Sequence, residues 1–181
     1  MCYVSLTIDS SCAKAEDRSK VIEAAKQARE EKRYENMAEC MQRAVQLNSN
    51  LVGDENDMFK EAYEKLVNQL YDQWKNAESF RQYEVVKKKL QNVVGDVMDL
   101  LESYILPSLE EYIKKKSTTD SVGVAFKYES FYRGMQIGIL EFAKEFTADL
   151  KETDNLLAQA HHAKFLADNG AAVLKSCKLL D

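Results

Sequence analysis

Turn-forming residues are scarce in this sequence of 181 residues, which contains one proline and six glycines. All-β sandwiches and barrels need many such residues, because a turn separates each pair of short strands. Hydrophobic residues make up 45% and charged residues 30% of the sequence, proportions that are typical of a folded chain rather than a disordered one. The composition therefore favours a helical globular protein.

Long apolar runs are also absent, since no stretch reaches the roughly 18 residues that a membrane span needs. Residues 1–7 carry no basic segment and only a short apolar run, which does not fit a secretory signal peptide. The four cysteines, Cys2, Cys12, Cys40 and Cys177, show neither a CxxC pair nor the spacing of metal ligands. Free thiols fit a reducing compartment, so we expect a soluble, cytoplasmic protein.

The sequence lacks catalytic and cofactor motifs as well, because it contains no GxGxxG, P-loop, GxSxG or HExxH pattern. His161 and His162 are adjacent, so on a helix their side chains point about 100° apart and cannot share a metal ion. The net charge of −5 argues against nucleic acid as the main partner. We expect no catalytic residue, no metal site and no cofactor, and we interpret the protein as a non-enzyme.

What the sequence does contain is a series of apolar stripes at i, i+3, i+4 and i+7 spacing, which predicts amphipathic helices. The expected helices span about residues 17–31, 34–47, 54–74, 83–106, 124–146 and 149–168, and a short seventh helix is expected at the end of the chain. Asp54 is the candidate N-cap of the third helix, and Pro107 is expected to stop the fourth. We also expect a polar loop over residues 114–120, and we expect the sixth helix to end at Asn169-Gly170.

This pattern predicts an all-α, antiparallel helical bundle or array without a sheet. We expect residues 17–181 to form a single domain and residues 1–16 to form an amino-terminal extension, for which disorder is one interpretation. The residues expected to be buried in one core are Tyr34, Met37, Tyr63, Leu66, Trp74, Leu101 and Phe131.

Four segments of the sequence resemble the 14-3-3 family and occur in the family's order. They are RYENMAECM at residues 33–41, the Ala62-Tyr63 pair with Trp74, DVMDLLESYILP at residues 96–107, and FYR at residues 131–133. The resemblance implies an all-helical adaptor in signalling, with a groove that binds phosphoserine or phosphothreonine peptides of other proteins. It implies neither a nucleic-acid nor a membrane partner.

The phosphate pocket of that family uses a Lys and an Arg on its third helix and an Arg-Tyr pair on its fifth, because charge-assisted hydrogen bonds to a dianion are strong. By resemblance, these positions are Glu64, Tyr71, Arg133 and Gly134 in this sequence. Each lost charged hydrogen bond is worth roughly 1.5–3 kcal/mol, and Glu64 adds repulsion of a phosphate. We therefore expect a degenerate phosphopeptide pocket, in which Arg133 either contacts phosphate or pairs with Glu64.

Two further departures from the family concern its hairpin, which takes part in the family's dimer interface, and its last helices, which complete the groove. The hairpin between the third and fourth helices is shorter by about fifteen residues, which is roughly two turns from each arm. The chain also ends soon after its sixth helix, where family members continue through the helices that supply the apolar wall of the groove.

Three functions stay open on these residues. One is an adaptor that still binds phosphorylated partners through Arg133 and nearby lysines such as Lys60 or Lys75. Another is a phosphate-independent interaction module built from the same helices. The last is an unrelated helical-repeat scaffold of the TPR type, although the sequence shows no signature at a 34-residue period.

The family dimerises by packing its first two helices against the hairpin of the partner. By resemblance, the apolar contact positions are Gln27 and Glu31, and the salt-bridge positions are Arg33, Asn36, Val85 and Lys89. A dimer of this type would bury a glutamate and place Arg33 against Lys89, at a cost of several kcal/mol. We expect a monomer, or a dimer built on another face.

Overall fold

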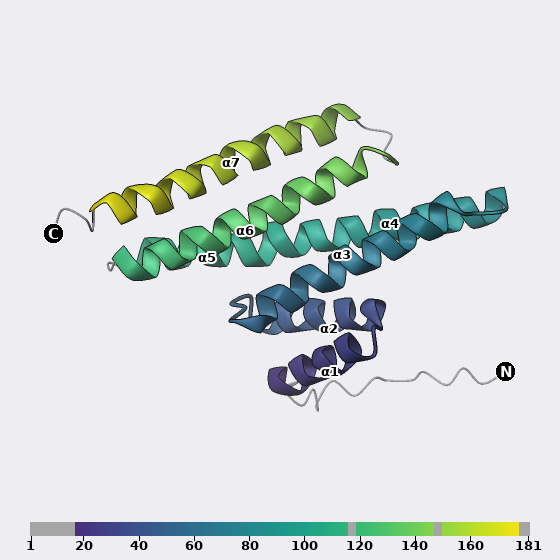
Figure 1. The fold of residues 1–181 in the computed structure, drawn as a ribbon, viewed down its shortest axis with the longest axis horizontal. Coiled ribbons are helices and arrows are strands. Elements are labelled where there is room, and N and C mark those ends of the chain that lie inside the picture. The colour runs from purple at the N-terminus through teal and green to yellow at the C-terminus, as the bar shows by residue number, and fades with distance from the viewer. Residues whose placement is uncertain (1–16, 116–118, 147–149, 178–181) are drawn as a thin grey trace, which may run out of the picture.

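The computed structural model describes residues 17–115, 119–146 and 150–177. All regular structure within these ranges is helical, which confirms the all-α prediction. The elements are α1 (Arg18–Glu30), α2 (Tyr34–Leu47), α3 (Asp54–Lys75), α4 (Phe80–Leu100), the π-helical turn η1 (Leu101–Ile105), α5 (Leu106–Lys115), α6 (Thr119–Ala143) and α7 (Leu150–Cys177) (Figure 1). The expected extension over residues 1–16 lies outside the described residues.

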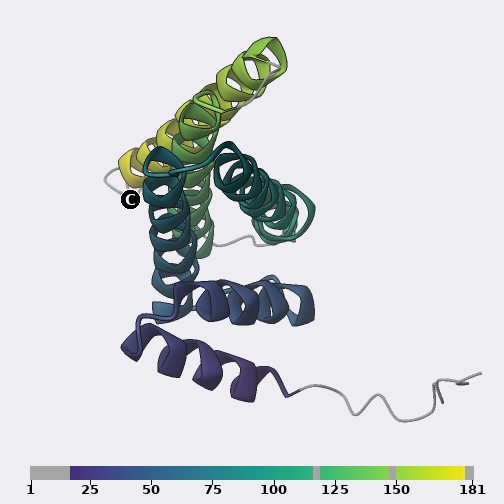
Figure 2. The ribbon, with the colours of Figure 1, turned by 90° about the vertical axis from the view of Figure 1, so that its right-hand side faces the viewer.

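The helices form an antiparallel array in which consecutive helices pack against each other. α3 and α4 make one long hairpin, and α6 and α7 make another that lies beside it (Figure 1). α1 and α2 lie across one end of α3, nearly perpendicular to it, as Figure 2 shows. None of the helices in the described ranges is long and apolar enough to cross a membrane.

The boundaries of the first helices follow local sequence chemistry. The carboxylate of Asp17 accepts the backbone N–H of Ser19 at 3.1 Å and so caps α1. The hydroxyl of Ser79 caps α4 in the same way by accepting the N–H of Gln82 at 3.2 Å. Asp54 was expected to cap α3, but it is the first helical residue, and the cap position is Gly53 with φ of 53°. A left-handed backbone conformation there favours glycine.

The predicted core is largely confirmed. Five of the seven expected residues are buried, and the other two, Tyr34 and Phe131, are partly buried and pack against the same cluster. The apolar stripe of α3 is buried along its whole length, from Phe59 to Trp74. Since α3 contacts α1, α2 and α4, this stripe is the centre around which the array is built.

The prediction that Pro107 stops the fourth helix was wrong. The chain stays helical from α4 through η1 into α5, and Pro107 is the second residue of α5. In η1 the backbone N–H of Leu106 bonds to the carbonyl of Leu101, five residues earlier rather than four. The wider turn separates the proline ring from the preceding carbonyls, which removes the clash that normally breaks a helix at proline. The expected polar loop over residues 114–120 was too long, because Lys114 and Lys115 belong to α5 and residues 119 and 120 belong to α6.

The expected helix end at Asn169-Gly170 was also wrong, because α7 continues through these residues to Cys177. The short additional helix that was expected after this break is therefore part of α7 within the described residues. Gly170 serves close packing rather than a helix end. A Cβ atom at this position would lie 2.9 Å from the ring of Phe126 on α6. The glycine therefore lets α6 and α7 approach each other closely.

Candidate functional site

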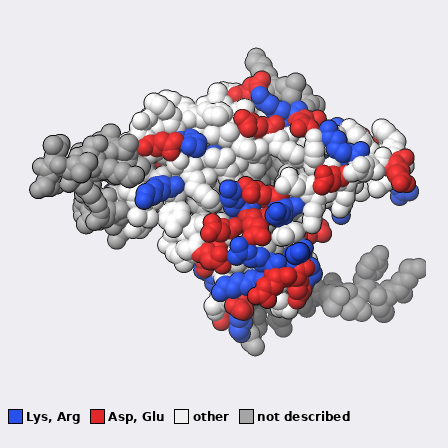
Figure 3. Space-filling model, in the orientation of Figure 1, with Lys and Arg blue, Asp and Glu red and all other residues white. Residues whose placement is uncertain are grey.

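α6 is the central helix of the candidate site, because three of its faces line three separate hollows. One hollow lies between α3 and α6 and includes Lys164 of α7, one lies between α5, α6 and α7, and one lies between the α2–α3 loop, α5 and α6. Figure 3 shows the face of the molecule that is seen in Figure 1. Acidic and basic side chains are interspersed over its lower part, where α1 and the start of α3 lie, without a continuous patch of one sign. The hollows therefore differ from one another mainly in their local lining.

The α3/α6 groove has a volume of about 520 Å³. Its floor is apolar and is made by Val67 of α3 and by Met135, Ile139 and Phe142 of α6, together with other side chains. Lys60 and Lys164 line the same groove. An apolar floor with cationic side chains at its edge is the kind of surface that binds a segment of another protein.

Both groove lysines already have acidic partners. The Nζ of Lys60 lies 3.5 Å from Glu64 and 5.5 Å from the centre of the Phe131 ring. The Nζ of Lys164 lies 2.7 Å from Asp168 one turn further along α7. A phosphate would have to compete with these carboxylates, and Glu64 faces the same space.

The structure brings three of the four family phosphate positions to this groove or its edge. Glu64 and Gly134 line it directly. Tyr71 lies beside it, with its ring centre 4.9 Å from that of Phe142, and its hydroxyl donates a hydrogen bond to Glu145. None of these three residues is basic.

Arg133 lies on another face of α6, in the hollow between α5, α6 and α7. Its guanidinium donates a hydrogen bond to the side-chain oxygen of Gln136 at 3.1 Å and lies 3.8 Å from Glu110. Of the two alternatives that the sequence left open for Arg133, pairing with Glu64 is not seen, because Arg133 lies against Glu110 and Glu64 lies against Lys60. The Arg133 side chain is only 17% exposed, and its Nε is buried without a hydrogen-bond partner among the residues that the structure describes.

Glu129 is a titratable neighbour of this half-buried arginine. Burial raises the pKa of the Glu129 carboxyl, and the negative charge of Glu110 raises it further, although Arg133 acts in the opposite direction. Ionisation of Glu129 therefore destabilises the fold. The stabilisation that comes from keeping it protonated is complete below about pH 4.5 and is lost as the pH rises through the raised pKa.

Replacing Glu129 with glutamine should therefore raise the free energy of unfolding at pH 7 relative to the unmodified protein. The difference should shrink as the pH falls and vanish below about pH 4.5, where both side chains are neutral. Urea titrations across this pH range measure it, with Glu84→Gln, an exposed position on α4, as the control. A gain that does not depend on pH would contradict the assignment.

All six positions that resemble the family's dimer interface are exposed. They are Gln27, Glu31, Arg33, Asn36, Val85 and Lys89. Several make contacts within this one chain. The amide of Gln27 donates to Glu31 at 2.9 Å, and Glu31 forms an ion pair with Arg33 at 2.5 Å. Lys89 lines a small hollow that also contains Glu35, at the junction of α2, α3 and α4.

Other polar residues give no sign of a metal centre. No group of three His, Cys, Asp or Glu residues within the described ranges is placed to hold a metal ion. His161 and His162 are both exposed on α7, and Cys40 is half-buried on α2.

Sequence reasoning missed Lys164 and Gly138, which also line the groove. Lys164 lies in a helix that was predicted from periodicity alone, and that pattern does not indicate which of the helix's residues line the α3/α6 groove. The spacing of Phe131, Met135 and Phe142 on one side of α6 was the only available indication of the groove floor.

Comparisons with known proteins agree with a distant relationship to 14-3-3 proteins. No family model matches the chain. The chain is 25% identical to 14-3-3 protein beta/alpha of Homo sapiens over 129 residues, which cover 63% of this chain and 52% of that protein. It is 27% identical to 14-3-3 protein beta/alpha-A of Xenopus laevis over 107 residues, which cover 51% of this chain and 44% of that protein. The chain thus spans about half the length of the curated relatives it matches, and its fold is an all-α array resembling 14-3-3 proteins.

Proposed function

We propose that this chain is a non-enzymatic, 14-3-3-like adaptor whose α3/α6 groove binds segments of other proteins without depending on a phosphate group. The position of Arg133 carries this proposal. It is the one basic residue kept at the family's phosphate positions, and it lies in a different hollow, paired with Glu110 and Gln136. Binding in the groove then rests on its apolar floor.

A phosphorylated partner is a weaker alternative, since the groove keeps Lys60 and Lys164. Each of these lysines has a carboxylate partner, so a phosphate gains little net attraction there. A scaffold unrelated to phosphopeptide recognition is the other alternative, and it would leave the groove without a role.

Blocking the groove tests the proposal. A Cβ atom at Gly138 meets no atom within 4 Å, and this exposed glycine lines the groove, so Gly138→Arg fills the groove without disturbing the core. Gly95→Arg is a matched control, because Gly95 is also an exposed helical glycine with open space around it. Proteins that copurify with the chain should be lost with Gly138→Arg and kept with Gly95→Arg. Equal retention by both variants would show that the groove is not the binding surface.

Phosphate dependence is measured separately, with a phosphoserine peptide of the kind that 14-3-3 proteins bind and its unphosphorylated twin. We expect equal affinities in a fluorescence titration. A tenfold preference for the phosphorylated peptide, which corresponds to about 1.4 kcal/mol, would contradict this expectation.

Restoring charge should change that result. The double variant Glu64→Lys, Tyr71→Arg removes the carboxylate and adds two cations at the groove, so phosphopeptide affinity should rise about tenfold or more while the unphosphorylated twin gains less. Glu84→Lys, which changes net charge away from the groove, should leave both affinities unchanged. A gain of the same size for both peptides would indicate a nonspecific effect of charge.

We also propose that the chain does not form the family's dimer, because Glu31 and Arg33 satisfy each other within one chain. Sedimentation at tens of micromolar should show a monomer, or a dimer that Arg33→Glu leaves intact. A dimer that Arg33→Glu disrupts would show that the family's interface survives.

A further inference from the structure

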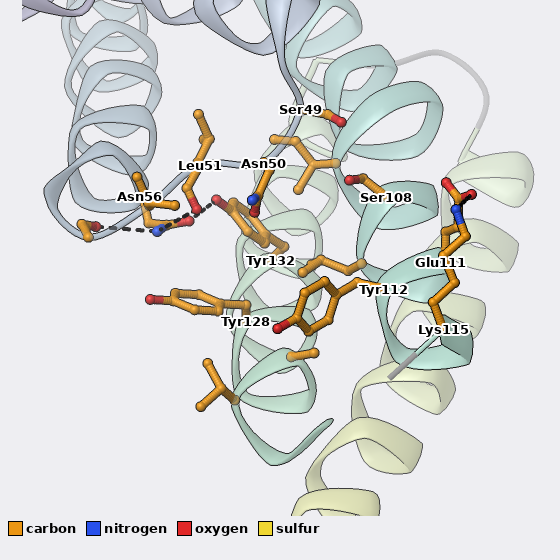
Figure 4. A pocket seen from close by; sticks show the side chains of 16 residues that line it. Ser49, Asn50, Leu51, Asn56, Ser108, Glu111, Tyr112, Lys115, Tyr128 and Tyr132 are labelled. Atoms are coloured by element: carbon orange, nitrogen blue, oxygen red, sulfur yellow. Dashed lines mark hydrogen bonds and ion pairs between the residues drawn. The ribbon is translucent and has the colours of Figure 1, made fainter. Parts of the chain in front are cut away.

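A second pocket lies apart from the groove, between the α2–α3 loop, α5 and α6, and has a volume of about 400 Å³ (Figure 4). We call it the tyrosine pocket after Tyr112 of α5 and Tyr128 and Tyr132 of α6, which line it. It shares no lining residue with the α3/α6 groove. Its α6 residues fall within 124–132, nearer the amino-terminal end of that helix than the groove residues within 130–142, so both surfaces can be occupied together.

The wall of this pocket is held in place by a buried hydrogen-bond network. The side-chain amide of Asn56, only 4% exposed, donates to the backbone carbonyls of Leu51 and Gly53 at 3.3 and 3.2 Å. Its oxygen accepts a hydrogen bond from the hydroxyl of Tyr132, which is itself buried (Figure 4). The loop therefore needs little ordering when a ligand binds, which lowers the cost of binding.

The rim of the pocket is unusually apolar for an exposed surface. Eight large hydrophobic side chains are exposed within the described ranges, and three of them, Val52, Tyr112 and Val124, line this pocket. A small molecule enclosed by the pocket would leave that rim in water, whereas a peptide segment would cover the pocket and its rim together.

The lining of the pocket carries no net charge, which favours an uncharged occupant. Its charged side chains are Glu111 and Lys115 of α5, and these neutralise each other with Nζ and Oε1 2.5 Å apart. The remaining polar groups, which include Asn50 and Ser108, are neutral and can bond to a peptide backbone (Figure 4). The tyrosine rings that line the pocket favour edge or offset packing with another ring. From these features we propose that the tyrosine pocket binds an uncharged aromatic side chain presented by an extended segment of a partner protein.

Nuclear magnetic resonance of the full ¹⁵N-labelled chain tests this with two probes. One is N-acetyl-tryptophanamide, and the other is the capped, uncharged peptide Ser-Val-Ser-Trp-Ser-Val-Ser. Both should shift the amide resonances of residues 49–53 and 108–112, and the peptide should bind about tenfold more tightly because it also covers the rim. Equal affinities would overturn the assignment to a protein segment in favour of a small-molecule site, and no shift at these residues with millimolar peptide would overturn the pocket altogether.

Two exposed valines provide matched variants. Val52, at 56% exposure, lies on the rim, and Val85, at 53% exposure, lies on α4 away from it. Val52→Lys should weaken peptide binding about tenfold, whereas Val85→Lys should not change it. Gly138→Arg should leave it unchanged too, so failure of this proposal is distinguishable from failure of the groove. Tighter peptide binding after removal of residues 1–16 would instead indicate that the chain's own amino-terminal segment occupies the pocket. Resonance shifts at the pocket that appear on concentrating the chain alone would indicate that a second copy of the chain occupies it.

Discussion

Replacing Trp74 with alanine will lower the free energy of unfolding by roughly 3–5 kcal/mol, measured by urea denaturation. Trp74 is 7% exposed and contacts three other aromatic rings, those of Tyr71, Tyr83 and Phe146, at centre distances of 5.7, 5.3 and 6.2 Å. Removing the indole leaves a cavity where α3, α4 and the end of α6 meet, and these three elements cannot all move inward to fill it.

Two further substitutions sharpen this result. The indole Nε1 is buried without a hydrogen-bond partner in the described part of the chain, so Trp74→Phe keeps most of the volume and removes an unsatisfied donor. It should therefore cost less than the alanine variant. Phe80→Ala, at a position that is 80% exposed, should change stability by no more than about 0.5 kcal/mol. A cost below about 1 kcal/mol for Trp74→Ala would mean that this part of the core is looser than described.

Replacing Asn56 with alanine should cost roughly 2–4 kcal/mol, a large effect for a single polar side chain. The substitution leaves two buried groups without this partner, the hydroxyl of Tyr132 and the carbonyl of Leu51, whereas the carbonyl of the exposed Gly53 keeps its hydrogen bond from the backbone N–H of residue 56. Each unsatisfied buried group is costly, although water that enters from the adjacent pocket will recover part of the loss.

A double-mutant cycle with Tyr132→Phe isolates one of these hydrogen bonds. The two substitutions should show a coupling of about 0.5–3 kcal/mol, because the phenylalanine variant no longer leaves a hydroxyl unsatisfied when Asn56 is removed. Purely additive effects would mean that Asn56 acts through the loop carbonyls alone. Thermal or urea unfolding of the four proteins measures the cycle.

The helices and their buried faces could be predicted because each stripe repeats at helical spacing within one element. The face of α3 from Phe59 to Trp74 is one example, since seven apolar residues specify a single side of the helix. Local patterns also gave two wrong predictions of helix ends. Pro107 and Gly170 were interpreted as helix ends from their usual backbone preferences, whereas the π-helical turn and the contact with Phe126 override those preferences.

The candidate site could be predicted in part only, because it depends on how helices are rotated relative to one another. Resemblance placed Glu64, Tyr71 and Gly134 at one surface, and the structure does bring them near the α3/α6 groove. The same reasoning placed Arg133 beside them, although it faces Glu110 and Gln136. The tyrosine pocket combines the loop before α3 with the consecutive helices α5 and α6, and no periodicity within one helix could indicate it.

The π-helical turn η1 also bears on how this chain is compared with others. A single π-helical turn is an α-helix with one extra residue inserted, and the insertion rotates everything beyond it by about 100°. α5 packs against α6 with the rotation that η1 gives it. Deleting one residue between Leu101 and Ile105 would restore an uninterrupted α-helix, yet it would turn Leu106 and Leu109 away from the core contacts they now make. A related sequence that is one residue shorter at this point should therefore carry its apolar residues in a different register over the following helix.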